Sequence, residues 1–130
     1  MAILIFERSA EISVRLADFI KETTRNKEVY YANSYVEAVS LLQEINARAV
    51  ILDANFPTNQ SMVLSGLIKK ANPETMVIIM YTYSDETILD QFREIGADHL
   101  LNKYDDFEKI PALIIANQEK ERKTGKKFNL

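Results

Sequence analysis

The chain has 130 residues, enough for one compact domain and hardly for a second. Hydrophobic residues make up 47% of the sequence and charged residues 27%, which is typical of a folded globular protein and excludes a disordered chain. The absence of cysteine excludes disulfides, thiolate metal sites and a cysteine nucleophile. No apolar run approaches the roughly 20 residues that cross a bilayer, and the apolar start of the chain reaches Glu7 and Arg8 too soon for a signal peptide. We therefore expect a cytoplasmic domain without a membrane partner.

The charge is slightly acidic and unevenly distributed. With 16 basic and 19 acidic residues the net charge is −3, which argues against a nucleic-acid-binding surface. Residues 119–127 are the exception, because lysine and arginine outnumber glutamate there. We divide the chain into a folded domain of residues 1–118 and a basic tail of residues 119–130. The tail is interpreted as the solvated end of a helix, where positive charge is favourable. An anionic partner or the start of a linker is the alternative.

Two hydrophobic periodicities alternate along the chain. Short apolar runs predict five buried strands, at residues 3–6, 28–32, 49–52, 76–80 and 99–101. After each run, apolar residues recur every three or four positions, which predicts five helices beginning near residues 9, 34, 60, 84 and 107.

Capping residues support these boundaries. Ser9, Ser34 and Ser84 are the expected N-caps of the first, second and fourth helices. Gly96 suits the C-terminal turn of the fourth helix. Pro111 is tolerated only near a helix start, so the regular part of the last helix is expected to begin beside this proline.

Strands that strictly alternate with helices define an α/β protein. Right-handed helical crossovers between parallel strands give a doubly wound five-stranded parallel sheet between two layers of helices. In such sheets, sites form beyond the carboxyl ends of the strands. The polar residues at these ends are Glu7 and Arg8 after the first strand, Asp53 after the third, Tyr81 and Thr82 after the fourth, and Asn102 and Lys103 after the fifth. We expect acids, hydroxyls and a lysine to converge at this edge.

Several segments in a fixed order carry a resemblance to a known family. They are Ile3-Leu4-Ile5-Phe6-Glu7, Val50-Ile51-Leu52-Asp53 with Phe56-Pro57, Val77-Ile78-Ile79-Met80, Gly96-Ala97-Asp98 and Leu101-Asn102-Lys103. In this order and spacing, residues 2–116 resemble the receiver domains of two-component response regulators. The resemblance implies a flavodoxin-like (βα)5 topology with strand order 2-1-3-4-5.

The resemblance also implies roles for three residues. Asp53 matches the aspartate that accepts a phosphoryl group from a histidine kinase or a phosphotransfer protein. Lys103 matches the lysine whose ammonium balances the charge of the acyl phosphate, and Asn55 occupies the position that offers a main-chain carbonyl to Mg²⁺. A polar strand end and a solvated lysine are the plain alternatives for Asp53 and Lys103. No enzyme activity beyond self-phosphotransfer and autodephosphorylation is expected.

One departure from the family concerns the metal. Receivers usually end the first strand with two acids, one of them a direct Mg²⁺ ligand, whereas Glu7 is followed here by Arg8. With Asp53 and Lys103 included, the site has no net charge, while the family's set carries −2 and calls for a divalent cation. Arg8 either pairs with Asp53 or points to solvent. In both cases Mg²⁺ at Glu7, Asp53 and Asn55 is predicted to be held weakly.

The switching residues depart from the family as well. Tyr81 stands where receivers use a small hydroxyl to follow the phosphoryl group. Thr82 comes one residue later, where alternation points it to the opposite face unless the strand bulges. Leu100 replaces a mobile aromatic residue, Ser61 a loop glycine and Tyr104 the proline after the lysine. We predict an atypical receiver whose switch is nearly locked.

Three functions remain open. The leading one is a stand-alone receiver in two-component signalling that acts by protein–protein contact, with weak homodimerisation through residues 84–115 and Tyr83 as a contact point. The second is a pseudo-receiver, which binds a partner without phosphorylation. The third is a flavodoxin-like enzyme or small-ligand binder. The chain has no glycine-rich phosphate loop and only one histidine, His99, which argues against the third function.

Overall fold

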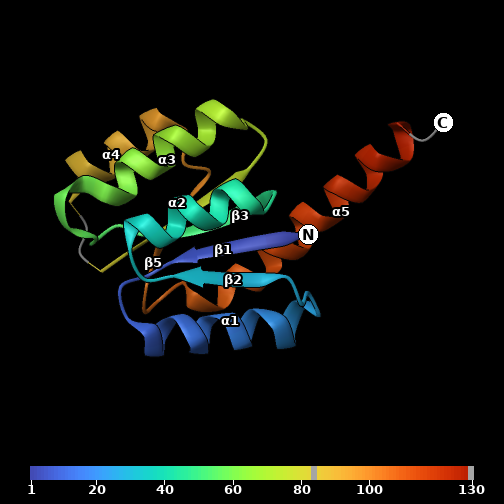
Figure 1. Cartoon of the computed structure of the whole chain (residues 1–130), viewed down its shortest axis with the longest axis horizontal. Coiled ribbons are helices and arrows are strands. Elements are labelled where there is room, and N and C mark those ends of the chain that lie inside the picture. The colour runs from blue at the N-terminus through green and yellow to red at the C-terminus, as the bar shows by residue number, and fades with distance from the viewer. Residues whose placement is uncertain (83–84, 129–130) are drawn as a thin grey trace.

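A five-stranded parallel sheet forms the middle layer of the molecule (Figure 1). The computed structural model describes residues 1–82 and 85–128, with side chains as far as Glu121. The strands are β1 (Ala2–Phe6), β2 (Val29–Ala32), β3 (Ala47–Asp53), β4 (Met76–Tyr81) and β5 (His99–Asn102). Their order is β2-β1-β3-β4-β5 and neighbouring strands pair in parallel. The α/β class and the strand order expected from the sequence are confirmed.

Helices cover both faces of the sheet. They are α1 (Ala10–Thr24), α2 (Tyr35–Glu44), α3 (Gln60–Ala71), α4 (Glu86–Ile95) and α5 (Ile110–Phe128). Helices α1 and α5 lie on one face, and α2, α3 and α4 lie on the other (Figure 1). Short 3-10 turns at Pro57–Asn59 and Phe107–Lys109 lead into α3 and α5. Among the described helices, none has the length and apolar character needed to cross a membrane.

The central strands are apolar throughout because helices cover both of their faces. The side chains that pack under α1 and α5 include Ile3, Ile5, Ile51 and Ile78. Those that pack under α2, α3 and α4 include Leu4, Phe6, Leu52 and Ile79. Each of these side chains is at most 1% exposed, and burying one stabilises the fold by about 1.5–3 kcal/mol. The strands therefore hold the residues at their carboxyl ends in fixed positions.

The helix boundaries test the expected caps. Ser9 Oγ accepts a hydrogen bond from Ile12 N–H at 3.2 Å, and Ser34 caps α2 in the same way. The prediction of Ser84 as the cap of α4 was wrong, because Asp85 is the N-cap and its carboxylate accepts from Thr87 N–H at 3.0 Å. Ser84 itself lies outside the described residues. Gly96 ends α4 with φ 107°, the left-handed conformation that glycine adopts freely.

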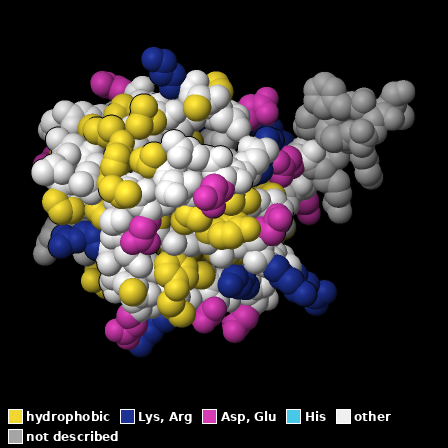
Figure 2. All heavy atoms as spheres, in the orientation of Figure 1, with side chains coloured by type: hydrophobic (Ala, Val, Ile, Leu, Met, Phe, Trp, Pro, Cys, Tyr) yellow, Lys and Arg dark blue, Asp and Glu magenta, His cyan; other side chains and the backbone are white. Residues whose placement is uncertain are grey.

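The last helix begins as expected and continues further. Its regular part starts at Ile110, after the 3-10 turn, with Pro111 in the first turn. It then runs without a break through residue 119, where the basic tail was expected to begin. On the face shown in Figure 2, basic and acidic side chains are interspersed, and no large patch of one sign forms there.

Candidate functional site

Three side chains from distant parts of the chain meet at the carboxyl edge of the sheet. Glu7 follows β1 and Asp53 ends the adjacent β3, and their side chains are only 6% and 8% exposed. Lys103 follows β5, and its ammonium pairs with Glu7 Oε1 and lies 3.3 Å from Asp53 Oδ2. The structure thus brings together two acids and the lysine that the strand ends indicated.

Main-chain donors complete the bonding of both carboxylates. Asn55 N–H donates to Asp53 Oδ1 at 2.9 Å, and Ser9 N–H donates to Glu7 Oε2 at 3.0 Å. Lys103 takes the remaining oxygen of each group. Every carboxylate oxygen of the pair therefore has a donor, which is the condition under which buried charge is tolerated.

The electrostatics of the site follow from burial and from these close charges. Burial is the largest influence on Asp53 and raises the pKa of its carboxyl; the Glu7 charge acts in the same direction, while Asn55 N–H and Lys103 oppose it. Burial alone would lower the pKa of the Lys103 ammonium, but its bond to Glu7 and the charge of Asp53 outweigh burial and raise that pKa. The site therefore keeps Lys103 charged and resists further negative charge.

Arg8 stays outside the buried site. Its side chain is exposed, and it forms no ion pair with any residue in the described part of the chain. Of the two arrangements expected for Arg8, the pairing with Asp53 is wrong and the solvent-facing one is observed. The charges of Glu7, Asp53 and Lys103 then sum to −1.

The Thr82 hydroxyl lies at the edge of the site, where it contacts Asn55. Strand β4 ends at Tyr81, so Thr82 lies beyond the strand and the alternation rule no longer fixes its direction. Its Oγ1 accepts a hydrogen bond from the side-chain amide of Asn55. Tyr81 is half-buried, and its main-chain carbonyl accepts from Lys103 N–H at 2.8 Å. Asn55 thus touches both sides of the site, through its main chain at Asp53 and through its side chain at Thr82.

The other residues that depart from the family pattern are Ser61, Tyr104 and Leu100, and they make structural contacts that the sequence did not reveal. Ser61 is buried at the start of α3, and its hydroxyl donates to the main-chain carbonyl of Asp53. Tyr104 is 78% exposed, and its N–H donates to Asn102 Oδ1 at 2.9 Å, a bond that proline cannot make. Leu100 is partly buried and packs on the core under α2, α3 and α4. Ser61 and the Tyr104 main chain thus bond to the ends of β3 and β5, and Leu100 packs on the core.

The loop that carries Lys103 is fixed by contacts of Asp106 that the sequence did not reveal. Asp106 accepts from Asn102 N–H at 2.8 Å and pairs with Lys109 at 2.9 Å. The Asn102 N–H, and then Lys109, lower the pKa of the Asp106 carboxyl. An Asn-x-x-x-Asp spacing after a strand is a weak signal, since both residue types are common in any turn.

The donors of the site do not fit the Mg²⁺ position that the family resemblance implies. Mg²⁺ needs oxygen ligands in octahedral geometry and usually takes one or two free carboxylates. Here Lys103 holds an oxygen of both Glu7 and Asp53, and Arg8 stands in place of the second acid. Across the described residues, no group of three or more carboxylate or imidazole side chains is arranged to hold a metal.

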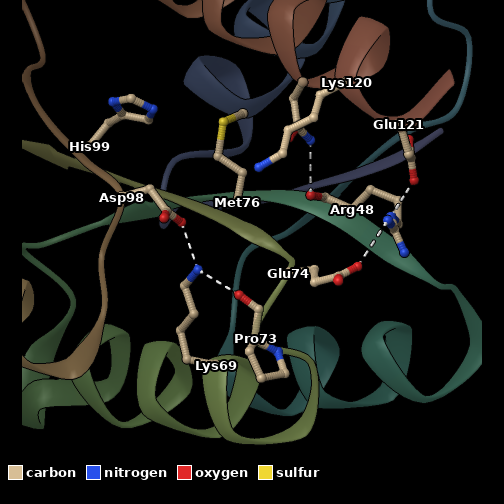
Figure 3. Close-up of a pocket in the computed structure, with 10 residues that line it drawn as sticks. Arg48, Lys69, Pro73, Glu74, Met76, Asp98, His99, Lys120 and Glu121 are labelled. Carbon is tan, nitrogen blue, oxygen red and sulfur yellow. Dashed lines mark hydrogen bonds and ion pairs between the residues drawn. The ribbon is translucent and has the colours of Figure 1, made fainter. Parts of the chain in front are cut away.

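A hollow of about 680 Å³ lies at the opposite edge of the sheet, near the starts of β4 and β5 (Figure 3). His99 borders it, and its charged lining residues are Arg48, Lys69, Glu74, Asp98, Lys120 and Glu121. These charges balance, with Lys69 2.8 Å from Asp98 and Arg48 paired with Glu121. The cavity beside Asp53 measures only about 30 Å³. We assign the site to the Asp53 edge because the bonded acids and lysine lie there.

This doubly wound sheet, with a buried aspartate ending β3, an acid after β1 and a lysine after β5, defines a domain of the receiver class. A family model described as the response regulator receiver domain matches residues 3–115. The chain belongs to this family, whose members are signalling modules of two-component systems rather than classical enzymes. A search of curated protein sequences found no match.

Solved structures share the fold. The receiver domain of a DNA-binding response regulator from Colwellia psychrerythraea has a TM-score of 0.76 at 22% identity, over 88% of this chain and 98% of that chain. The N-terminal domain of an uncharacterized protein from Wolinella succinogenes has a TM-score of 0.84 at 18% identity, over 95% and 98%. The response regulator TrrA from Thermotoga maritima, solved with Mg²⁺-BeF, has a TM-score of 0.75 at 23% identity, over 90% and 99%. At these identities the likeness establishes the fold.

Proposed function

We propose that this receiver domain accepts a phosphoryl group on Asp53 from a phosphohistidine of a histidine kinase or phosphotransfer protein. The observation that carries the proposal is the bonded set of Glu7, Asp53 and Lys103. It holds one carboxylate at the end of a buried strand with a cation 3.3 Å away. A positioned carboxylate beside a fixed positive charge is what a phosphoryl acceptor requires.

The transfer needs few groups. An oxygen of Asp53 attacks the phosphorus, a new O–P bond forms, and the P–N bond of the phosphohistidine breaks with its electron pair remaining on the imidazole nitrogen. Lys103 stabilises the charge on the phosphoryl oxygens. Asn55 N–H holds Asp53 Oδ1 in place, which leaves Oδ2, on the Lys103 side, as the attacking oxygen. Thr82 supplies the small hydroxyl near the phosphoryl group, because Asn55 already holds it at the edge of the site.

A second function, partner binding without phosphorylation, is favoured by the packing of Leu100. This residue is partly buried and packs against the core, where receivers place a mobile aromatic side chain. A partner, or a second copy of the chain, would then find a constant surface on α4, β5 and α5. That surface exposes Ile88, Tyr104 and Ile115 at 43%, 78% and 38%. Tyr83, expected as a further contact, lies outside the described residues.

Intact-mass measurement after treatment with acetyl phosphate and Mg²⁺ tests the proposal. One added phosphoryl group on the native chain, absent from Asp53→Asn, supports phosphorylation at Asp53. Asp18→Asn is a matched control because Asp18 is an exposed acid on α1. If neither acetyl phosphate nor a phosphorylated histidine donor modifies the chain, the phosphoacceptor role fails and binding without phosphorylation takes its place.

A further inference from the structure

The charge of the site changes sharply when Asp53 carries a phosphoryl group. A phosphoryl group adds about −1.5 to −2 charges near neutral pH, while the aspartate gives up its own charge to the new ester-like bond. Glu7 remains buried and negative, and among the described residues Lys103 is the one cation bonded to it. The phosphorylated site would therefore carry a net charge of roughly −2, and it has no free pair of acids to bind a divalent cation. It needs a second positive group.

Arg8 is placed to be that group. Phe6 pairs with Leu52 in the sheet, so Glu7 lies beside Asp53 and Arg8 follows one residue further along the same edge. The Arg8 side chain is exposed and has no ion-pair partner among the described residues, so no existing bond has to break before it can turn. A guanidinium offers a planar fork of N–H donors that matches two phosphoryl oxygens.

We infer that Arg8 and Lys103 together form a metal-independent binding site for the phosphoryl group on Asp53. This inference rests on the proposed phosphoacceptor role of Asp53. In this site, Lys103 binds the phosphoryl oxygen on the β5 side. The Arg8 side chain turns inward from solvent and binds the other phosphoryl oxygens. With an acyl phosphate as donor, an Asp53 oxygen forms the new O–P bond, the donor's O–P bond breaks, and the electron pair leaves on the donor's carboxylate. No proton and no metal is needed to balance the step.

The test compares modification with and without a divalent cation. The native chain is treated with acetyl phosphate in Mg²⁺ or in EDTA, and the modified fraction is followed by intact mass. We expect similar rates in both buffers, and a loss of about tenfold or more for Arg8→Gln in EDTA. Arg15→Gln is the matched control, since Arg15 is a 77% exposed arginine on α1 and should leave the rate unchanged. Arg8→Asp restores the second acid and should make modification depend on Mg²⁺.

A binding measurement tests the proposed phosphoryl-binding site independently of the rate at which Asp53 is modified. Beryllofluoride, a phosphoryl mimic, should give a bound ¹⁹F signal with the native chain in EDTA, and the signal should be lost in Arg8→Gln. Modification that requires Mg²⁺ in the native chain, or Arg8→Gln behaving like Arg15→Gln, would overturn the role of Arg8 and leave the phosphoacceptor role intact. No modification of Asp53 in either buffer, even from a phosphorylated histidine donor, would overturn both.

Discussion

Replacing Lys103 with methionine removes the cation shared by two buried carboxylates and keeps most of the side-chain volume. The ammonium lies 3.3 Å from Asp53 Oδ2, where the Coulomb attraction is about 5 kcal/mol at an effective dielectric constant of about 20. Desolvation of the charges and the lost freedom of the lysine offset much of this attraction, and Lys103 is itself 20% exposed. We expect the free energy of unfolding at pH 7 to fall by about 2–3 kcal/mol.

The loss is expected to depend on pH. In the variant, Asp53 faces Glu7 without a cation, so the pKa of Asp53, already raised by burial, rises further. A carboxyl with a higher pKa in the folded chain binds more protons when folded than when unfolded. Stability therefore decreases as the pH rises from the unfolded pKa through the folded one. The difference between the native chain and Lys103→Met should be smaller at about pH 5 than at pH 7.

Urea unfolding followed by circular dichroism at both pH values measures this difference. Lys27→Met is the matched control, because Lys27 is an exposed lysine far from this loop in the sequence and its loss should change stability little. An equal loss at both pH values, or a loss no larger than in the control, would refute the assignment of Lys103 as the counter-ion of both carboxylates.

The site and the helix beside it allow four more tests. Calorimetric titration should show weaker Mg²⁺ binding to the native chain than to Arg8→Asp, and equal binding would contradict the charge argument. Asp53→Asn should leave the unfolding free energy unchanged or raise it by up to about 1 kcal/mol, because burial raises the pKa of the native carboxyl. A clear loss of stability in urea unfolding would show that the ion pair between Asp53 and Lys103 outweighs the cost of burial. Ser61→Ala should cost about 1 kcal/mol through its lost bond to a main-chain carbonyl. Ser65→Ala should leave the unfolding free energy unchanged, since the buried Ser65 Oγ has no partner in the described structure. Equal losses of unfolding free energy in Ser61→Ala and Ser65→Ala would contradict this reasoning. Beryllofluoride should shift NMR amide signals near Asp53 but few in residues 84–115, and widespread shifts there would reveal a mobile switch.

The fold was predictable because its determinants are short apolar runs and local capping residues. The runs in β1, β3 and β4 read as strands buried on both faces, and Ser9 and Ser34 marked two helix starts. Once the sheet is parallel, the carboxyl ends of its strands must share an edge, which is why Asp53 and Lys103 were expected together. Topology alone places these residues, without knowledge of any side-chain conformation.

The sequence could not predict features for which two local conformations have nearly equal free energy. Ser84 and Asp85 are both good caps, and the backbone of Asp85 in an extended conformation decides between them. Arg8 had two reasonable directions, because the cost of desolvating a guanidinium and the gain from pairing it with Asp53 are of similar size. The contact between Asn55 and Thr82 depends on two loops that no periodicity describes.

The ion pair between Glu7 and Lys103 joins residues 96 positions apart, so it forms only after the edge strand β5 has docked on β4. When β1 and β3 pair before β5 docks, Glu7 and Asp53 lie side by side with no cation between them. Contacts between distant segments carry a large loop-closure cost and form late in folding. In that order of events, the repulsion between the two acids opposes closure of the central sheet, and a chain that has not yet placed β5 has no cation beside Asp53. The arrangement of Glu7, Asp53 and Lys103 therefore exists only in molecules in which β5 is in place.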